Sequence, residues 1–244
     1  MTNPNNQAQL QSIVNCIDLT SLTGHETIED ILSLCCMART PLGDCAAICV
    51  YPQWISHART ALEHSNVRIA TVCNFPHGRD SLENTLQSIQ QAINLGADEI
   101  DVVLPYHLIQ NQQSDLCRNF LHAVRDTALD KTLKVIIESG ELTIDQVRIA
   151  TEYVIESRAD FVKTSTGKTS TGATPDAVAQ ILRCLQHHSR IGIKLSGGIS
   201  TFEQATAYLQ QIKTAMGETW ATPNHCRFGA SRLLEHILSV ADNQ

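Results

Sequence analysis

The stretch "DFVKTSTGK", residues 160–168, places two lysines five positions apart at the end of a short apolar run. The two apolar residues after the aspartate indicate a buried strand, so Lys163 belongs to that strand, and Gly167 and Lys168 lie in the loop that follows. Removing an ammonium group from water costs several kcal/mol unless the group is paired or neutralised. A solvent-facing edge strand is one interpretation of Lys163, and a buried lysine with a chemical role is the other.

Similar short runs of β-branched residues recur along the chain and alternate with longer amphipathic segments. This alternation predicts repeated βα units and a parallel sheet. No linker rich in Pro, Gly or Ser divides the chain, so we expect residues 1–244 to form one α/β domain, a (β/α)8 TIM barrel. An open doubly wound sheet is the alternative. Eight runs are predicted as strands, at residues 16–20, 46–51, 68–75, 99–105, 133–139, 161–166, 191–197 and 227–231.

Two of the segments between these runs carry clear helix signals. One starts at Ser81 with "SLENTLQSIQQAINLGAD", and the other starts at Thr174 with "TPDAVAQILRCLQHH". In the second segment, threonine followed by proline is typical of an N-cap and a first helical position. Both segments therefore predict helices between neighbouring strands.

Composition excludes several classes of function. Hydrophobic residues make up 43% of the 244 residues and charged residues 18%, which is typical of a globular protein. The net charge of -7 argues against a nucleic-acid or membrane partner, although a local basic pocket can still hold a phosphate. No apolar stretch approaches 18 residues, and the N-terminus shows no secretory signal, so we expect a cytoplasmic protein.

Cysteine spacing gives no sign of a metal centre. The chain has nine cysteines, with no CxxC pair and no Cys/His spacing of the zinc type. We interpret them as reduced thiols that mostly fill the core, and we expect no metal and no cofactor.

The alternation of side chains along the predicted strands sends several polar residues to one side. Where the apolar residues of a strand face the helices, the remaining residues face the interior of the barrel. By this parity Asp18, Cys49, Asp101, Lys163 and Lys194 all point inward. A structural salt-bridge cluster is one interpretation. A catalytic group is favoured, because ionisable residues at the mouth of a barrel are where chemistry occurs.

Two buried lysines and an aspartate suit carbonyl chemistry. A neighbouring ammonium in a site of low dielectric destabilises the charged form of a lysine and favours the neutral amine. The neutral amine can attack a carbonyl and form a protonated Schiff base, which allows an adjacent C–C bond to break or form. Asp101 can supply and recover the protons, directly or through a water.

Glycine-rich turns follow the last three predicted strands. Backbone N–H groups near a helix start bind phosphate, and the loops after the seventh and eighth strands of a barrel are a frequent phosphate site. The sequence therefore indicates a small phosphorylated carbonyl compound as substrate. The residues concerned are Gly167, Lys168, Gly197, Gly198, Gly229 and Ser231.

Motifs across nearly the whole chain resemble one enzyme family. They are "AAICVYP", "ATVCNFPHG", "GADEIDVV", "KVIIESGEL", "DFVKTSTGK", "IGIKLSGGI" and "RFGAS", in this order. Together they resemble the deoxyribose-phosphate aldolases, class I aldolases with a (β/α)8 fold. The resemblance implies reversible, metal-independent cleavage of 2-deoxy-D-ribose 5-phosphate to acetaldehyde and D-glyceraldehyde 3-phosphate, in deoxyribose phosphate catabolism.

The resemblance also implies a role for each matching residue. Lys163 would form the Schiff base, Lys194 would lower its pKa, and Asp101 would transfer protons. Asp18 would orient the lysines, and Thr20 and Cys49 would line the sugar pocket. The phosphate would be held by Gly167, Lys168, Gly197, Gly198, Gly229, Ser231 and Arg232.

Two departures from the family pattern affect these expectations. Arg232 stands where the enterobacterial form has a second serine, and Ser200 stands where that form has an arginine. We expect Arg232 to supply the positive charge that Ser200 lacks. The sequence also ends "VADNQ", without the terminal tyrosine that assists proton transfer in some members.

Other interpretations stay open from the sequence. The same fold could carry a sugar-phosphate isomerase with a carboxylate base, or a sugar-phosphate-binding barrel without chemistry. Glu138 is expected to pair with Lys134 inside the barrel, in a supporting or a purely structural role. We expect a phosphorylated sugar as partner, and a homodimer is left open as an assembly.

Overall fold

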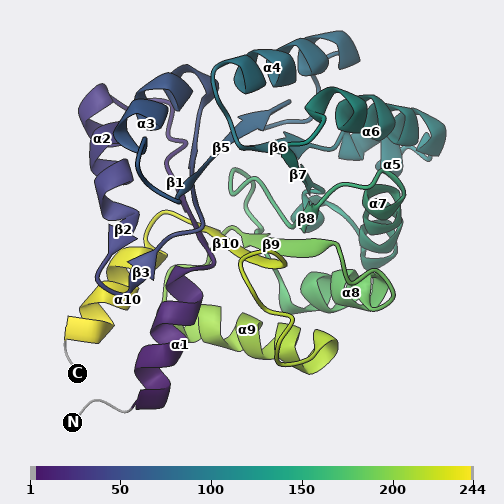
Figure 1. The fold of residues 1–244 in the computed structure, drawn as a ribbon. Helices are drawn as coiled ribbons and strands as arrows, with labels where there is room; N and C mark the ends of the chain where they lie inside the picture. Colours follow the sequence, from purple (N-terminus) through teal and green to yellow (C-terminus); the bar gives the residue numbers. More distant parts are fainter. Residues whose placement is uncertain (1–3, 243–244) are drawn as a thin grey trace.

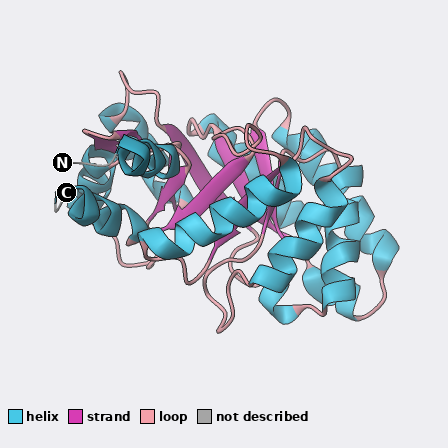
Figure 2. Cartoon of the chain, turned by 90° about the horizontal axis from the view of Figure 1, so that it is seen from below, coloured by secondary structure: helices cyan, strands magenta, loops and turns pink. Residues whose placement is uncertain are grey.

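Eight parallel strands close into a barrel in the computed structural model, which describes residues 4–242 (Figure 1). The strands are hydrogen-bonded in the order β1-β10-β9-β8-β7-β6-β5-β4, and the first and last close the ring. Helices surround the strands on the outside (Figure 2). The (β/α)8 barrel is thus confirmed, and the open doubly wound alternative is wrong because β1 pairs with both β10 and β4 and closes the sheet into a ring.

All eight predicted strands are present, and most end earlier than expected. The carboxyl ends are shortened because the chain turns into loops at the mouth of the barrel; for example, the strand with Lys163 ends at that residue. A short antiparallel hairpin was not predicted; it comprises β2 (Arg39–Thr40) and β3 (Gly43–Asp44). The barrel strands are β1 (Ile17–Thr20), β4 (Ala47–Val50), β5 (Arg68–Cys73), β6 (Glu99–Val103), β7 (Thr132–Ile136), β8 (Phe161–Lys163), β9 (Gly192–Ser196) and β10 (Cys226–Ala230).

Capping side chains fix the starts of both helices predicted from sequence. Thr174 accepts a hydrogen bond from the backbone N–H of Ala177, and Ser81 accepts one from the N–H of Asn84. Asn243 and Gln244, part of the C-terminal stretch interpreted above, lie outside the described residues. The helices are α1 (Pro4–Val14), α2 (Ile28–Met37), α3 (Ile55–Ala61), α4 (Leu82–Asn94), α5 (Tyr106–Gln110), α6 (Ser114–Ala128), α7 (Ile144–Glu156), α8 (Pro175–Leu185), α9 (Phe202–Met216) and α10 (Leu233–Asp242), with 3-10 turns at Pro52–Trp54 and Ser139–Glu141. Within the described chain, none of these helices has the length and apolar character needed to cross a membrane.

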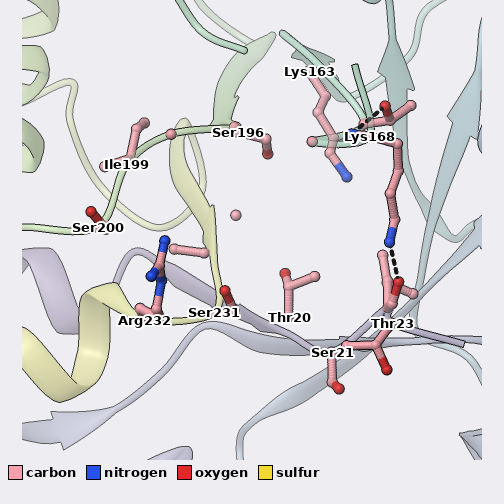
Figure 3. Close-up of a pocket in the computed structure, with 17 residues that line it drawn as sticks. Thr20, Ser21, Thr23, Lys163, Lys168, Ser196, Ile199, Ser200, Ser231 and Arg232 are labelled. Carbon is pink, nitrogen blue, oxygen red and sulfur yellow. Dashed lines mark hydrogen bonds between the residues drawn. The ribbon is translucent and has the colours of Figure 1, made fainter. Parts of the chain in front are cut away.

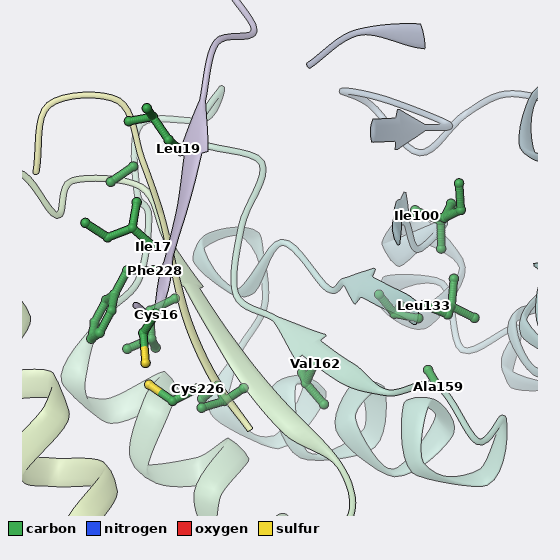
Figure 4. Packing of buried hydrophobic residues seen from close by; sticks show 14 of the residues in the cluster. Cys16, Ile17, Leu19, Ile100, Leu133, Ala159, Val162, Cys226 and Phe228 are labelled. Carbon is green, nitrogen blue, oxygen red and sulfur yellow. The ribbon is translucent and has the colours of Figure 1, made fainter. Parts of the chain in front are cut away.

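The main hydrophobic core lies between the barrel and the helices. Figure 4 shows outward-facing strand residues of this core, among them Ile17, Leu19, Val162 and Phe228. Each is almost completely buried, and burying a side chain of this size contributes about 1.5–3 kcal/mol. Because one parity of every strand is used for this packing, the other parity is left to fill the interior.

The interior of the barrel is divided into an apolar part and a charged part. Beside β4 and β5 it holds a small apolar cluster that includes Ala47, Cys49, Ala70 and Val72. Phe161 also faces inward and is buried, which explains why it shares the parity of Lys163. A Cβ atom at Gly192 would lie 2.5 Å from the Phe161 ring, so glycine leaves room for this aromatic ring. The remaining strands supply charged side chains.

Candidate active site

Seven charged side chains form one ion-pair network inside the barrel. All are buried, and the most exposed of them, Arg227, is only 6% accessible to solvent. The members come from β1, β6, β7, β8, β9 and β10, so the closure of the barrel brings them together. The ion-pair network consists of Asp18, Glu99, Asp101, Lys134, Lys163, Lys194 and Arg227.

Asp101 lies at the centre of the ion-pair network. One carboxylate oxygen accepts hydrogen bonds from Lys163 Nζ at 2.8 Å and from Lys194 Nζ at 2.7 Å, and the other accepts from Lys134 Nζ at 2.9 Å. Asp18 lies 2.6 Å from both Lys194 Nζ and Arg227 Nη1. The structure thus brings together the four catalytic candidates predicted from sequence.

Two members of the ion-pair network, Glu99 and Arg227, were not predicted from the sequence, and Lys134 was predicted inside the barrel with a different partner. Lys134 Nζ lies 2.5 Å from Glu99, and Arg227 Nη2 lies 3.0 Å from the same carboxylate. The signal was available, because Glu99 precedes Asp101 by two residues and Arg227 precedes Gly229 by two, so each shares the inward parity of its neighbour.

The formal charges of the ion-pair network do not cancel if every group is ionised. It holds three carboxylates and four cationic side chains. One excess charge in a buried site is unfavourable, and a lysine can remove it by losing a proton, whereas arginine keeps its proton. The balance therefore favours one neutral lysine.

The pKa directions identify that lysine as Lys163. Burial lowers its pKa below the ordinary value, and the ammonium of Lys194 acts in the same direction, although Asp101 opposes both. Burial also lowers the pKa of Lys194, but its ion pairs with Asp101 and Asp18 outweigh that effect and raise it. Burial raises the pKa of Asp101, but its three lysine partners outweigh this and hold it well below its usual range. Lys194 therefore lowers the pKa of Lys163 as the sequence predicted, but burial lowers it more.

Replacing Lys134 tests the structural part of the ion-pair network. Lys134→Met leaves Glu99, Asp101 and Asp18 with less compensating charge, so the free energy of unfolding should fall by about 3–5 kcal/mol. Lys213→Met breaks an exposed pair with Glu218 and should cost less than about 1 kcal/mol. Chemical denaturation of both variants measures the difference. Equal losses would show that the interior pairs contribute no more than surface pairs.

A cavity of about 360 Å³ opens above the ion-pair network at the carboxyl ends of the strands (Figure 3). Lys163 is the one network member that lines it in the described part of the chain, and its side chain points toward the cavity from β8 (Figure 3). The reactive lysine predicted from sequence is therefore also the accessible one. The full lining is Thr20, Ser21, Leu22, Thr23, Lys163, Thr166, Gly167, Lys168, Ser196, Gly197, Gly198, Ile199, Ser200, Gly229, Ala230, Ser231 and Arg232.

The lining of the cavity is suited to an anion. Lys168 and Arg232 contribute positive charge, and no acidic residue lines the cavity in residues 4–242. Lys168 Nζ donates to the backbone carbonyl of Leu22 at 2.5 Å, which places its ammonium on the far side of the cavity from the loop after β9. A cationic pocket on a chain with a net charge of -7 indicates selection for a negatively charged ligand.

Glycines shape the cavity for two different reasons. Gly167, Gly197 and Gly198 have φ values of 73°, 85° and 84°, in the left-handed region where other residues are strained. Gly229 instead supplies space, because a Cβ atom there would lie 2.4 Å from Ser196 Oγ and 3.0 Å from Lys194 Cε. All seven residues predicted to hold a phosphate line this one cavity.

Two expectations from the sequence are corrected. Cys49 does not line the cavity; its thiol is fully buried in the apolar cluster, and burial raises its pKa, so it is a poor nucleophile toward aldehydes. Glu138 does not pair with Lys134. It follows the end of β7 with a φ of 51°, which breaks the strand alternation, and its carboxylate accepts hydrogen bonds from Thr166 and Thr169.

Comparisons with known proteins agree with this geometry. A family described as DeoC/LacD family aldolase matches residues 12–237. The structure of a "putative deoxyribose-phosphate aldolase" from Coccidioides immitis is 29% identical, with a TM-score of 0.85 over 95% of this chain and 87% of that one. A deoxyribose phosphate aldolase from Aeropyrum pernix, described as tetrameric, is 22% identical, with a TM-score of 0.80 over the whole of both chains.

Proposed function

The chain belongs to the DeoC/LacD family of aldolases, and from this premise we propose that it cleaves 2-deoxy-D-ribose 5-phosphate reversibly to acetaldehyde and D-glyceraldehyde 3-phosphate. The observation that carries the proposal is the position of Lys163. Its amine is buried, has a lowered pKa and is hydrogen-bonded to Asp101. It lies at the floor of a cavity whose other charged lining residues are cationic.

The reaction begins at the amine of Lys163. The neutral amine attacks carbon 1 of the open-chain sugar, and the carbinolamine then loses water to give a protonated imine. Asp101 is placed to accept the amine proton and to return it to the departing hydroxyl. Because its cationic partners hold the pKa of Asp101 low, the proton passes through this carboxylate rather than resting on it.

The imine then accepts the electrons of the breaking bond. Asp101, through a water, accepts the proton of the hydroxyl on carbon 3 as the bond between carbons 2 and 3 breaks, which releases D-glyceraldehyde 3-phosphate and leaves an enamine on Lys163. The same proton returns to carbon 2 and gives the protonated imine of acetaldehyde, which water hydrolyses to free acetaldehyde and the amine. Because its own pKa is raised, Lys194 keeps its proton, and its ammonium favours the neutral amine of Lys163 that starts the reaction.

The lining of the cavity favours this reaction over the isomerase alternative. A sugar-phosphate isomerase of this fold needs a carboxylate base in contact with the substrate, and no acidic residue of the described chain lines the cavity. A barrel that only binds a sugar phosphate has no need for a second buried lysine beside the first. The aldolase proposal needs no carboxylate in the cavity lining, and it gives the second buried lysine a role.

Arg232 is proposed to hold the phosphate at the rim. It lines the cavity together with Ser200, the position where a serine replaces the arginine of the enterobacterial form (Figure 3). Arg232→Ser should raise KM for the phosphorylated sugar about tenfold, because a charge-assisted hydrogen bond is lost, and should leave kcat nearly unchanged. Steady-state cleavage assays measure both constants. An unchanged KM would show that Arg232 does not replace the missing arginine.

Two measurements on the purified enzyme test the proposed function. A coupled assay should detect D-glyceraldehyde 3-phosphate formed from 2-deoxy-D-ribose 5-phosphate. Borohydride reduction in the presence of acetaldehyde should add an ethyl group to a lysine, because only an imine is reduced to a stable amine. Formation of D-glyceraldehyde 3-phosphate without a reducible adduct would overturn the Schiff base. Conversion of the sugar phosphate with neither D-glyceraldehyde 3-phosphate nor an adduct would support the isomerase class of chemistry.

A further inference from the structure

Ser196 carries a hydroxyl group that the protein leaves without a partner. It is the last residue of β9, lines the cavity, and is only 4% exposed. Its Oγ atom is buried and has no hydrogen-bond partner among the described residues. Buried hydroxyl groups are normally hydrogen-bonded, so an orphaned one in a binding cavity points to a ligand.

The surroundings of this hydroxyl are built to keep it free. Gly229 is the register partner of Ser196 across β9 and β10, and any side chain at that position would collide with the hydroxyl. Neighbouring hydroxyls are already committed: Ser165 donates to the carbonyl of Ser196 itself, and Thr20 donates to the carbonyl of Asp18. Figure 3 shows the Ser196 hydroxyl pointing toward the open part of the cavity.

The position of Ser196 along β9 determines which part of a substrate its hydroxyl would contact. Ser196 is one pleat above Lys194, at the level between the ion-pair network and the glycine rim, and it is followed directly by Gly197 and Gly198. Lys163, Ser196 and Arg232 line the same cavity. A phosphorylated sugar that forms an imine at Lys163 and holds its phosphate at Arg232 would bring the carbon between the reacting carbons and the phosphate to this level.

We propose that Ser196 recognises the hydroxyl on carbon 4 of the sugar phosphate, which is the hydroxyl on carbon 2 of the aldehyde acceptor in the reverse reaction. This inference rests on the proposed function and goes further, because it assigns a specificity-determining residue. Ser196 thus distinguishes a hydroxylated phosphorylated aldehyde from the same aldehyde without the hydroxyl.

The test compares two acceptors in the synthesis direction with acetaldehyde. One is D-glyceraldehyde 3-phosphate, and the other is 3-oxopropyl phosphate, which lacks only the hydroxyl on carbon 2. Ser196→Ala should lower kcat/KM for the first about tenfold and leave kcat/KM for the second within about twofold of wild type. The quantity compared is the ratio of kcat/KM for the first acceptor to kcat/KM for the second. Comparing this ratio between wild type and variant removes the intrinsic difference in reactivity between the two aldehydes.

Ser139→Ala is the matched control. Ser139 is also 4% exposed, and its hydroxyl also has no partner among the described residues, but it does not line this cavity. Replacing Ser139 should leave the ratio of kcat/KM between the two acceptors unchanged. If Ser196→Ala does not fold, Ser196→Cys keeps the volume with a weak donor and should show the same loss of discrimination.

The outcomes separate this inference from the proposed function. An equal loss with both acceptors, or no change with either, overturns the role of Ser196. Borohydride trapping of acetaldehyde on Lys163 is measured in the same variants. If trapping persists and the acceptor ratio does not change, only the inference fails; if wild type shows no trapping, the proposed function fails.

Discussion

Lys163→Met is expected to abolish the formation of a reducible acetaldehyde adduct and to lower kcat/KM for sugar cleavage by about four orders of magnitude or more. Methionine keeps the length and much of the volume of lysine but has no amine to attack the carbonyl. The side chain is only 3% exposed. Because Lys163 is the neutral lysine of the ion-pair network, its replacement leaves three carboxylates facing three cations, so the fold should be retained. Mass spectrometry after borohydride reduction, with circular dichroism as a check of folding, measures the effect.

Lys168→Met is the matched control for this result. Lys168 lines the same cavity, but its ammonium contacts the backbone carbonyl of Leu22 rather than Asp101. Its replacement should weaken binding of the phosphorylated sugar and leave the ethyl adduct at Lys163 intact. An adduct that survives in Lys163→Met and disappears in Lys168→Met would reverse the assignment of the two lysines.

Lys194→Met is expected to move the activity to higher pH. Its removal takes away one of the two influences that lower the pKa of Lys163 and leaves the opposing carboxylate of Asp101 in place. The pKa of Lys163 therefore rises, so a smaller fraction of the amine is neutral at pH 7, and kcat/KM there should fall about 100-fold. Activity should recover in part as the pH is raised through the new pKa. The pH profile of kcat/KM measures the shift of its acid limb.

Lys194→Arg provides the control for charge. Arginine keeps a positive group beside Asp18 and Asp101, so the acid limb should stay near its wild-type position even if the rate is lower. The same loss of rate in both variants, with no movement of the acid limb in Lys194→Met, would mean that Lys194 acts through packing and not through its charge.

Strand parity predicted much of this site from the sequence alone. The eight strands and the inward direction of Asp18, Asp101, Lys163 and Lys194 follow from the period of two, since apolar residues on the other parity pack against the helices. Barrel closure then determines that inward charges meet, because residues on different strands share one interior.

The parts that the sequence did not predict depend on contacts that periodicity does not specify. Glu138 follows the end of a strand in a left-handed conformation, so its direction does not obey the alternation. Cys49 has the correct parity, but the apolar side chains around it bury its thiol completely. The free hydroxyl of Ser196 depends on the absence of a side chain at Gly229, on the neighbouring strand.

The most direct test of the account is the titration of the Lys163 amine in the free enzyme, followed by NMR of ¹⁵Nζ-labelled lysines and assigned with Lys163→Met. The account predicts that Lys163 loses its proton below the ordinary lysine pKa of 10.5, while Lys194 stays protonated through that range. A Lys163 amine that titrates at or above the ordinary value, or a Lys194 amine that deprotonates first, would contradict it.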